Sequence, residues 1–204
     1  KDPGRLSYNY LLNCAKTMDG CNGGDFPAAD LFINPLGAPV YGADGKYTAI
    51  EGQCLQSPVS ASTASYRILG TDLGAHPDQP RPSFKDIAYV VGVLHQPVAV
   101  DVAVDSNWQS YYQGVYNRCA ASKTDELNHM VVIEGYDCEN SVDSQGHCAF
   151  DSNGNLPSGV GTWTIRNSWG PNWGRSGYII TKATSRSGEL CNGIAMDALY
   201  YELQ

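Results

Sequence analysis

The sequence predicts an α+β protein, with helices in the first part of the chain and a twisted antiparallel sheet or barrel after Pro97. Two observations support this prediction. Apolar residues recur at helical spacing in several segments before Pro97, whereas short runs rich in β-branched and aromatic residues dominate after it. The 204 residues suffice for one large domain or two lobes that share an interface, and the 22 glycines and 13 tyrosines indicate a loop-rich fold.

Three helices are expected. Residues 6–15 show apolar spacing after Ser7, which can serve as the N-cap. Residues 26–34 follow a glycine turn and have Pro27 near the first helical position. Residues 83–96 give the clearest helical pattern, with an N-cap residue and a continuous apolar stripe.

Loops are expected at residues 34–63 and 70–83, which are rich in Pro, Gly and Ser. The later part of the chain is expected to form five strands, at residues 98–104, 129–136, 161–166, 176–183 and 196–203. Residues 138–160 have the character of an insertion between two of these strands. Within it, residues 151–155 only faintly resemble a calcium loop, because the glycine is fourth rather than sixth and Thr162 replaces the final Glu.

Charge and cysteine content restrict the partners and the compartment. The net charge of −8 argues against nucleic acid and mildly for cationic partners, although solubility alone would also explain it. No apolar run approaches the roughly 18 residues that span a bilayer, so membrane insertion is not expected. The seven cysteines indicate an oxidising compartment, and their spacings predict no metal site and no cofactor.

His129 begins one of the expected strands, and taken alone it would be interpreted as a structural residue. A second segment changes this interpretation. Asn167 follows an alternating strand and lies beside Trp169 and Trp173 in a glycine-rich loop, where exposed tryptophans need a reason.

Four motifs in this order resemble the papain-like cysteine peptidases, the cathepsin family. They are "LSYNYLLNCAKTMDGCNGG" from Leu6, "NHMVVIEGY" from Asn128, "NSWGPNWGRSGY" from Asn167, and "CNGIAMDALYY" from Cys191, which carries an inserted Asn192. The resemblance is weakest at residues 34–83 and 138–160. It implies a papain-like two-lobe fold, with about 1–83 as the rest of a helical lobe and about 84–204 mainly an antiparallel, barrel-like β lobe.

The resemblance also implies a thiol endopeptidase that acts on peptide or protein substrates. His129 would be the imidazolium partner of a cysteine thiolate, and Asn167 would orient the ring through its side-chain carbonyl. Trp169 would cover that hydrogen bond, and Trp173 would line the leaving side of the cleft. Protein inhibitors are further candidate partners, and a secreted, lysosome-like or vacuole-like compartment and a zymogen form are expected.

The family's nucleophilic cysteine and its oxyanion-hole glutamine lie upstream of the motif that begins at Leu6, so neither can be assigned here. By family correspondence Cys14 should pair with Cys54 and Cys119 with Cys191, which leaves Cys138 and Cys148 to close the inserted loop. Cys21 would then bond to a cysteine outside this chain. We therefore expect a separate, cleaved or absent N-terminal piece that carries the nucleophile.

On the substrate side, the resemblance makes Gly23 and Gly24 the backbone that pairs with an extended peptide. The pocket for the second residue before the scissile bond would be lined by Phe26, Leu127, Asn128 and Asp197. An acid at Asp197 would allow arginine as well as apolar residues there, and Asp101 is a candidate second acid for this pocket. Alternatively, Asp197 points to solvent.

Two other functions are compatible with the sequence. The chain could be a catalytically inactive homologue that uses its cleft as a binding module. It could also be another acyl-transfer enzyme with a Cys-His-Asn arrangement, such as a transglutaminase, but the motifs at Cys21 and Asn167 favour a peptidase. The inserted loop lacks the paired histidines of the dipeptidyl-releasing branch of the family, so an endopeptidase is expected.

Overall fold

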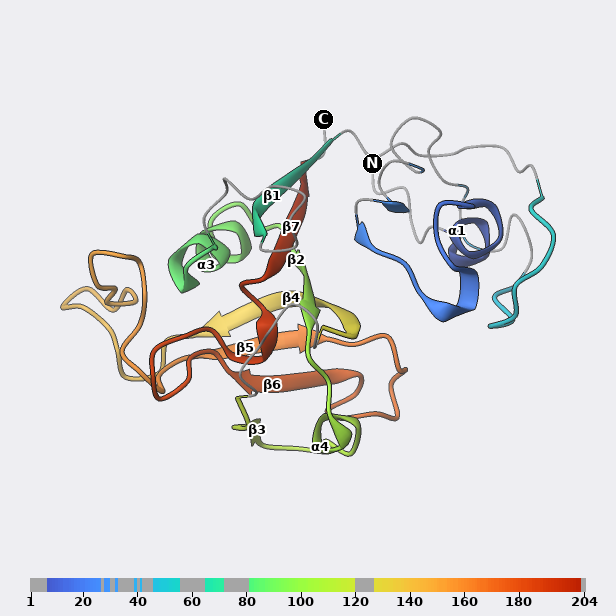
Figure 1. Ribbon diagram of the computed structural model, residues 1–204. Coiled ribbons are helices and arrows are strands. Elements are labelled where there is room, and N and C mark those ends of the chain that lie inside the picture. Colours follow the sequence, from blue (N-terminus) through green and yellow to red (C-terminus); the bar gives the residue numbers. More distant parts are fainter. Residues whose placement is uncertain are drawn as a thin grey trace. The chain divides into compact units, whose positions relative to one another are not determined.

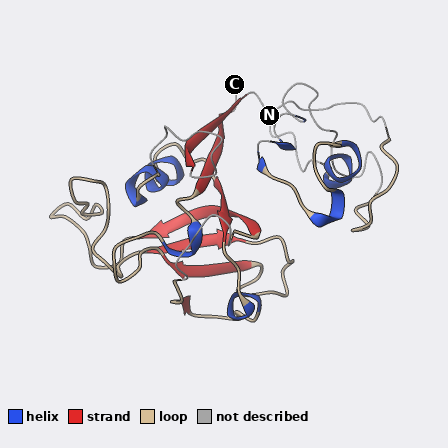
Figure 2. Cartoon of the chain, viewed as in Figure 1, coloured by secondary structure: helices blue, strands red, loops and turns tan. Residues whose placement is uncertain are grey.

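A computed structural model gives the fold, and it describes residues 7–26, 28, 29, 32, 39, 41, 46–55, 65–71, 81–119 and 127–202. The chain forms two compact units (Figures 1 and 2). Unit 1 comprises residues 1–66 and 201–204, and unit 2 comprises residues 67–200. The expected lobe boundary near residue 83 stays a prediction.

Unit 1 contains the first predicted helix, which is confirmed as α1 (Tyr8–Cys14). Ser7 is its N-cap, because the Ser7 hydroxyl accepts a hydrogen bond from the Tyr10 N–H. A short 3-10 helix, η1 (Gly20–Asn22), lies in the expected glycine turn. In the helix predicted at 26–34, Phe26, Ala28, Ala29 and Phe32 are helical, and the remaining residues lie outside the described part of the chain.

The main sheet has seven strands in the order β1-β7-β2-β4-β5-β6-β3. Their bounds are Ser65–Thr71 (β1), Val98–Val102 (β2), Val115–Tyr116 (β3), His129–Asp137 (β4), Thr162–Arg166 (β5), Tyr178–Lys182 (β6) and Asp197–Glu202 (β7). The α+β class and the five expected strands are confirmed. β1 and β3 were not predicted, and neither was the short helix α4 (Ser106–Gln109).

The sequence left a twisted antiparallel sheet or a barrel open, and the structure shows the sheet. The described strands form an open sheet that ends at β1 and β3, rather than a closed barrel. Most neighbouring pairs are antiparallel, but β3 pairs with β6 in parallel. The two-residue β3 is too short to carry the alternation that would have revealed its pairing.

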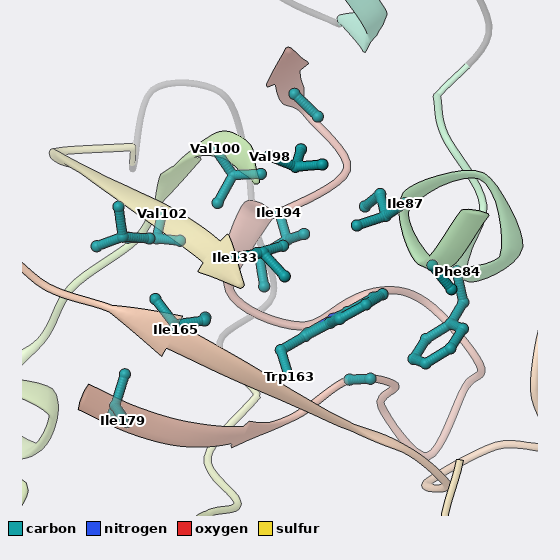
Figure 3. Close-up of a cluster of buried hydrophobic side chains, with 14 of the residues drawn as sticks. Phe84, Ile87, Val98, Val100, Val102, Ile133, Trp163, Ile165, Ile179 and Ile194 are labelled. Carbon is teal, nitrogen blue, oxygen red and sulfur yellow. The ribbon is translucent and has the colours of Figure 1, made fainter. Parts of the chain in front are cut away.

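One face of the sheet packs against α3 (Phe84–Gly92) and forms the core of unit 2. The β2–β4 register places Val98 opposite Ile133 and Val100 opposite Val131, so these side chains share one face. From α3, Phe84 stacks on Trp163 with ring centroids 4.2 Å apart (Figure 3). Burial of each such side chain contributes about 1.5–3 kcal/mol, which makes this core the main stabiliser of unit 2.

The α3 helix begins where the sequence predicts. Ser83 and Asp86 form a capping box, in which each side chain accepts a hydrogen bond from the backbone N–H of the other residue. The helix ends at Gly92, earlier than the predicted residue 96. A Cβ atom added at Gly92 would lie only 2.6 Å from the Tyr136 hydroxyl oxygen. This end of the helix therefore lies close against β4.

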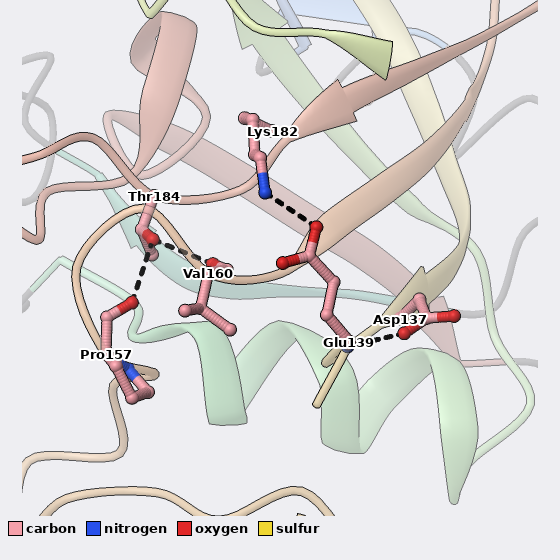
Figure 4. A network of polar contacts seen from close by, with 6 residues as sticks. All are labelled: Asp137, Glu139, Pro157, Val160, Lys182 and Thr184. Atoms are coloured by element: carbon pink, nitrogen blue, oxygen red, sulfur yellow. Dashed lines mark hydrogen bonds and ion pairs between the residues drawn. The ribbon is translucent and has the colours of Figure 1, made fainter. Parts of the chain in front are cut away.

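Residues 138–160 form a connection between β4 and β5 that is tied to the sheet by several polar contacts (Figure 4). The Lys182 ammonium lies 2.6 Å from a Glu139 carboxylate oxygen, and the Thr184 hydroxyl donates to the Val160 carbonyl at 2.8 Å. Asp151 accepts hydrogen bonds from the N–H groups of Asn153 and Asn155. The Asp151 carboxylate therefore organises its own turn.

Candidate active site

His129 and Asn167 come together because of the antiparallel β4–β5 pairing. His129 begins β4, and Asn167 directly follows β5. The register pairs Val132 with Arg166, so the end of β5 lies beside the start of β4. The His129 Nε2 atom is 2.9 Å from the Asn167 Oδ1 atom, and the Asn167 N–H donates to the Gly177 carbonyl at 2.9 Å.

A second hydrogen bond determines which way the Asn167 amide points. The Ser168 N–H donates to Asn167 Oδ1 at 2.7 Å, and only the oxygen of the amide can accept it. The same oxygen faces His129, so His129 Nε2 is the donor and carries the proton. A flipped amide would lose the hydrogen bond from the Ser168 N–H. In neutral His129, the Nδ1 atom is therefore the nitrogen that can accept a proton.

Burial makes this arrangement costly to disturb. The Asn167 side chain is 9% exposed, and its Nδ2 atom is buried without a hydrogen-bond partner among the described residues. A buried, unpaired polar group costs about 1–3 kcal/mol. The buried Nδ2 atom of Asn167 therefore destabilises the fold, while the Oδ1 atom of the same side chain holds the imidazole.

Two tryptophans lie next to the pair. The Trp169 ring lies against the His129 imidazole, with centroids 4.9 Å apart, and contacts Trp173 edge to face at 5.0 Å. The Trp173 Nε1–H donates to the Gln109 carbonyl at 2.8 Å. The loop that carries both rings requires glycine at Gly174, where φ is +56° and a Cβ would lie 2.4 Å from the Tyr178 carbonyl oxygen.

The segment before His129 is fixed to β2 by Asn128. Its side-chain oxygen accepts from the Val104 N–H at 2.9 Å, and its amide nitrogen donates to the Val104 carbonyl at 3.1 Å. The Asn128 side chain thus has a structural role in addition to the one expected from the resemblance. Leu127, just before it, is half-buried.

Asp197 begins β7 and is buried, with 6% of its surface exposed. Asp101, on β2, is 7% exposed. The β2–β7 register pairs Ala99 with Leu199 and Val100 with Ala198, so its continuation places Asp101 beside Asp197. Two carboxylates therefore lie at the same level of neighbouring strands, and Asp101 is opposite Met130, the residue after His129.

Gly23, Gly24 and Phe26 belong to unit 1. Gly23 has φ of +134°, and both glycines are exposed. Gly24 makes no backbone–backbone hydrogen bond with any residue in the described segments. The roles of these residues as substrate-binding groups stay predictions.

All seven cysteines lie in described segments. Three disulfide bonds join Cys14 to Cys54, Cys119 to Cys191 and Cys138 to Cys148, the same pairs that the resemblance implies. Cys21 is free and exposed, with its sulfur 3.8 Å from the Ala49 carbonyl oxygen.

Two contacts of the site could not be expected from the sequence. The Ser168 N–H is a backbone group, whose position depends on the turn that follows β5. Tyr111, which contacts Trp173 with ring centroids 5.8 Å apart, comes from a distant part of the chain. Tyr111 follows a helix of only four residues, which gives no periodic signal.

An imidazole held by a buried asparagine carbonyl, at the ends of two central strands of an α+β protein, is the arrangement that the resemblance to thiol peptidases implies. A family model described as "Papain family cysteine protease" matches residues 1–201. The chain belongs to the papain family of cysteine proteases, and its α+β fold is papain-like.

Relatives and solved structures agree with this assignment. The chain is 34% identical over 198 residues to "Vignain" of Vigna mungo, and 33% identical over 202 residues to "Ananain" of Ananas comosus. These matches cover 96% and 98% of this chain but 46% and 49% of the relatives, so the chain spans about half their length.

Among solved structures, the bromelain protease of Ananas comosus, in complex with the E64 inhibitor, matches with a TM-score of 0.71 and 34% identity. That match covers 98% of this chain and 79% of bromelain. Digestive procathepsin L 3 of Tenebrio molitor matches with a TM-score of 0.72 and 26% identity, over 98% of this chain and 56% of that one. No helix within the described segments is long and apolar enough to cross a membrane.

Proposed function

We propose that the protein is a thiol-dependent endopeptidase in which His129 and Asn167 are two members of a Cys-His-Asn arrangement. The hydrogen bond of 2.9 Å between His129 Nε2 and Asn167 Oδ1 carries this proposal. It leaves His129 Nδ1 to exchange protons with a thiol, and an imidazolium at this position lowers the thiol pKa.

The reaction follows from this proton placement. The thiolate forms a bond to the peptide carbonyl carbon, and the imidazolium at His129 then gives its Nδ1 proton to the leaving amine as the C–N bond breaks. Neutral His129 next takes a proton from a water molecule, which hydrolyses the thioester and releases the thiol. Throughout, Asn167 holds the Nε2–H, Trp169 shields this bond from water, and Trp173 borders the leaving side.

We further propose that the nucleophilic cysteine is on an N-terminal piece outside these 204 residues, tethered through Cys21. Six of the seven cysteines are in disulfide bonds, and Cys21 is free and exposed. An exposed thiol in a protein with three disulfides is available for a bond to another cysteine.

For specificity, we propose that Leu127, Asn128 and Asp197 border a pocket that accepts a basic or apolar residue second before the scissile bond. Asp197 and Asp101 are both buried, and continuation of the β2–β7 register would bring their strand positions side by side, where carboxylates would attract a guanidinium. Gly23 and Gly24 would pair with the extended backbone of the substrate. Protein inhibitors are further candidate partners and would compete with the substrate for binding.

The location and processing of the protein follow from the same evidence. Three disulfide bonds and similarity to plant cysteine proteases support a secreted or vacuole-like compartment. Procathepsin L 3 is a precursor, which supports a zymogen form for this protein as well.

Intact mass and active-site labelling test the proposal. Protein isolated without reducing agent should lose a disulfide-linked segment on reduction, and before reduction it should be labelled by E64, the inhibitor bound in the bromelain structure. A Cys21→Ser variant should lose the linked segment. A homogeneous species of 22.0 kDa that resists E64 and cleaves no peptide would contradict the proposal and favour a non-catalytic binding module.

A further inference from the structure

A chain of aromatic contacts connects the catalytic histidine to a buried tyrosine in unit 2. His129 contacts Trp169 at 4.9 Å, Trp169 contacts Trp173 at 5.0 Å, and Trp173 contacts Tyr111 at 5.8 Å between ring centroids. Exposure falls along this chain, from 38% at Trp169 to 8% at Tyr111. The exposed Trp169 ring is therefore linked, through Trp173, to the buried Tyr111 ring.

Trp169 depends on ring contacts for its position. The described residues provide no hydrogen-bond acceptor for the Trp169 indole N–H. The Trp169 ring instead contacts the rings of His129 and Trp173. Trp173, in contrast, is held at two points. Its indole N–H donates to the Gln109 carbonyl, and its ring packs against Tyr111.

Tyr111 is itself firmly placed. Its hydroxyl donates to the Gly114 carbonyl at 2.7 Å and accepts from the Ile180 N–H at 3.4 Å. Its ring also occupies the space next to Gly174, where an added Cβ would lie 3.2 Å from the tyrosine ring. Tyr111 thus joins the loop of Trp173 to strand β6.

The segment around Tyr111 has a rigid base. Asp105 caps α4 by accepting from the Trp108 N–H at 2.8 Å, and it accepts from the Tyr116 hydroxyl at 2.9 Å. Trp108 is fully buried and packs edge to face on Tyr116. Gln109 and Tyr111, the two residues that hold Trp173, follow directly from this base.

We propose that Tyr111 is a positioning residue for the His129–Asn167 pair, acting through Trp173 and Trp169. Its effect on catalysis rests on the function proposed above, whereas its effect on His129 does not. When Tyr111 no longer supports Trp173, the Trp169 ring is free to leave the imidazole. Water then competes for Asn167 Oδ1, and the His129 ring loses its fixed orientation.

The test measures His129 directly, in protein labelled with nitrogen-15 histidine. The exchange of the Nε2 proton with water reports how often the hydrogen bond to Asn167 is exposed. Because an aromatic pair contributes a modest energy, Tyr111→Leu should speed this exchange about two- to tenfold, and Tyr111→Phe should have a smaller effect. The neighbouring tyrosine, Tyr112, is 72% exposed, so Tyr112→Leu is the matched control and should leave exchange unchanged.

Two further variants separate positioning from general destabilisation. Val98→Ala weakens the core at the far end of β2 and should lower the melting temperature without changing Nε2 proton exchange. In a Trp173→Phe background, replacing Tyr111 with Phe or Leu should add little, because the contact chain is already altered. A folded Tyr111→Leu variant with unaltered exchange, or Tyr111 and Trp173 effects that simply add, would overturn the proposal.

The measurement also separates this inference from the proposed function. Proton exchange at His129 does not depend on a nucleophile. A protein that shows the expected exchange pattern but cleaves no peptide would keep Tyr111 as a positioning residue and contradict the peptidase function. A peptidase in which Tyr111→Leu leaves both the Nε2 proton exchange and the pH dependence of kcat/KM unchanged would support the proposed function and contradict the positioning role of Tyr111.

Discussion

The hydrogen bond between His129 and Asn167 makes Asn167→Ala the most informative substitution. This change removes the only described acceptor for the His129 Nε2–H and also the acceptor for the Ser168 N–H. The imidazole then rotates more freely, and the imidazolium loses a partner that is 9% exposed. The substitution therefore acts at the step in which His129 carries a positive charge.

The size of the effect follows from the charge of the donor. A hydrogen bond to a charged group contributes about 1.5–3 kcal/mol, which corresponds to a fall of about 10- to 150-fold in kcat/KM. The loss should appear mainly in kcat, because in the proposed mechanism Asn167 orients His129 rather than the substrate. Asn167→Asp retains an oxygen acceptor for both N–H groups, so it should lose less activity than Asn167→Ala.

The assay is hydrolysis of a fluorogenic peptide by the intact protein, with the pH dependence of kcat/KM measured for each variant. Asn153→Ala, in the exposed turn around Asp151, is the matched control and should retain full activity. Asn167→Asp should retain more of kcat/KM than Asn167→Ala. An Asn167→Ala enzyme with unchanged kcat, or one altered only in KM, would refute the role given to this bond.

Three other predictions concern specificity, pH dependence and the loop of Trp173. Asp197→Ala should reduce kcat/KM more for substrates with arginine second before the scissile bond than for substrates with leucine at that position. An unchanged ratio of the two kcat/KM values would contradict the acidic pocket. The hydrogen bond from the Asn107 side chain, followed by that from the Trp108 N–H, lowers the pKa of Asp105 in the folded protein. The charged carboxylate therefore stabilises the fold at pH values above its ordinary pKa of about 3.9, and this stabilisation is lost as the pH falls through the lowered pKa. Asp105→Asn, which retains a capping side chain, should therefore be less stable than the unmodified protein at pH 7 in urea unfolding, and the difference should shrink as the pH falls below about 3.9. A stability difference that persists at low pH would exclude the charge as its cause. Gly174→Ala should lower the free energy of unfolding by at least 1–3 kcal/mol, roughly the cost of a strained backbone, and Gly159→Ala, which has open space around it, should cost less.

Much of the fold was predictable because its signals are local. The caps Ser7 and Ser83 and the apolar spacing that follows them predict α1 and α3, and alternating or apolar runs predict β2, β4, β5, β6 and β7. The strand order and the parallel β3–β6 pair could not be predicted, because they depend on contacts between distant segments.

For the site, sequence motifs suggested the pair of His129 and Asn167 but not how the pair is held. The amide orientation of Asn167 depends on the Ser168 backbone, and the support of Trp173 depends on Tyr111 and the Gln109 carbonyl. A backbone N–H or C=O has no signature in the sequence. Such groups become visible only when the turn that places them is known.

The inserted segment has a consequence for how this protein tolerates changes in length. Its ends meet, because Asp137 at the end of β4 is paired with Thr162 at the start of β5. His129 lies at the opposite end of the nine-residue β4, roughly 26 Å away along the strand. The exposed residues 142–147 of this segment are thus a permissive position, where a shorter turn or a grafted peptide could replace them while Leu156 stays in the core and the His129 end of β4 keeps its geometry.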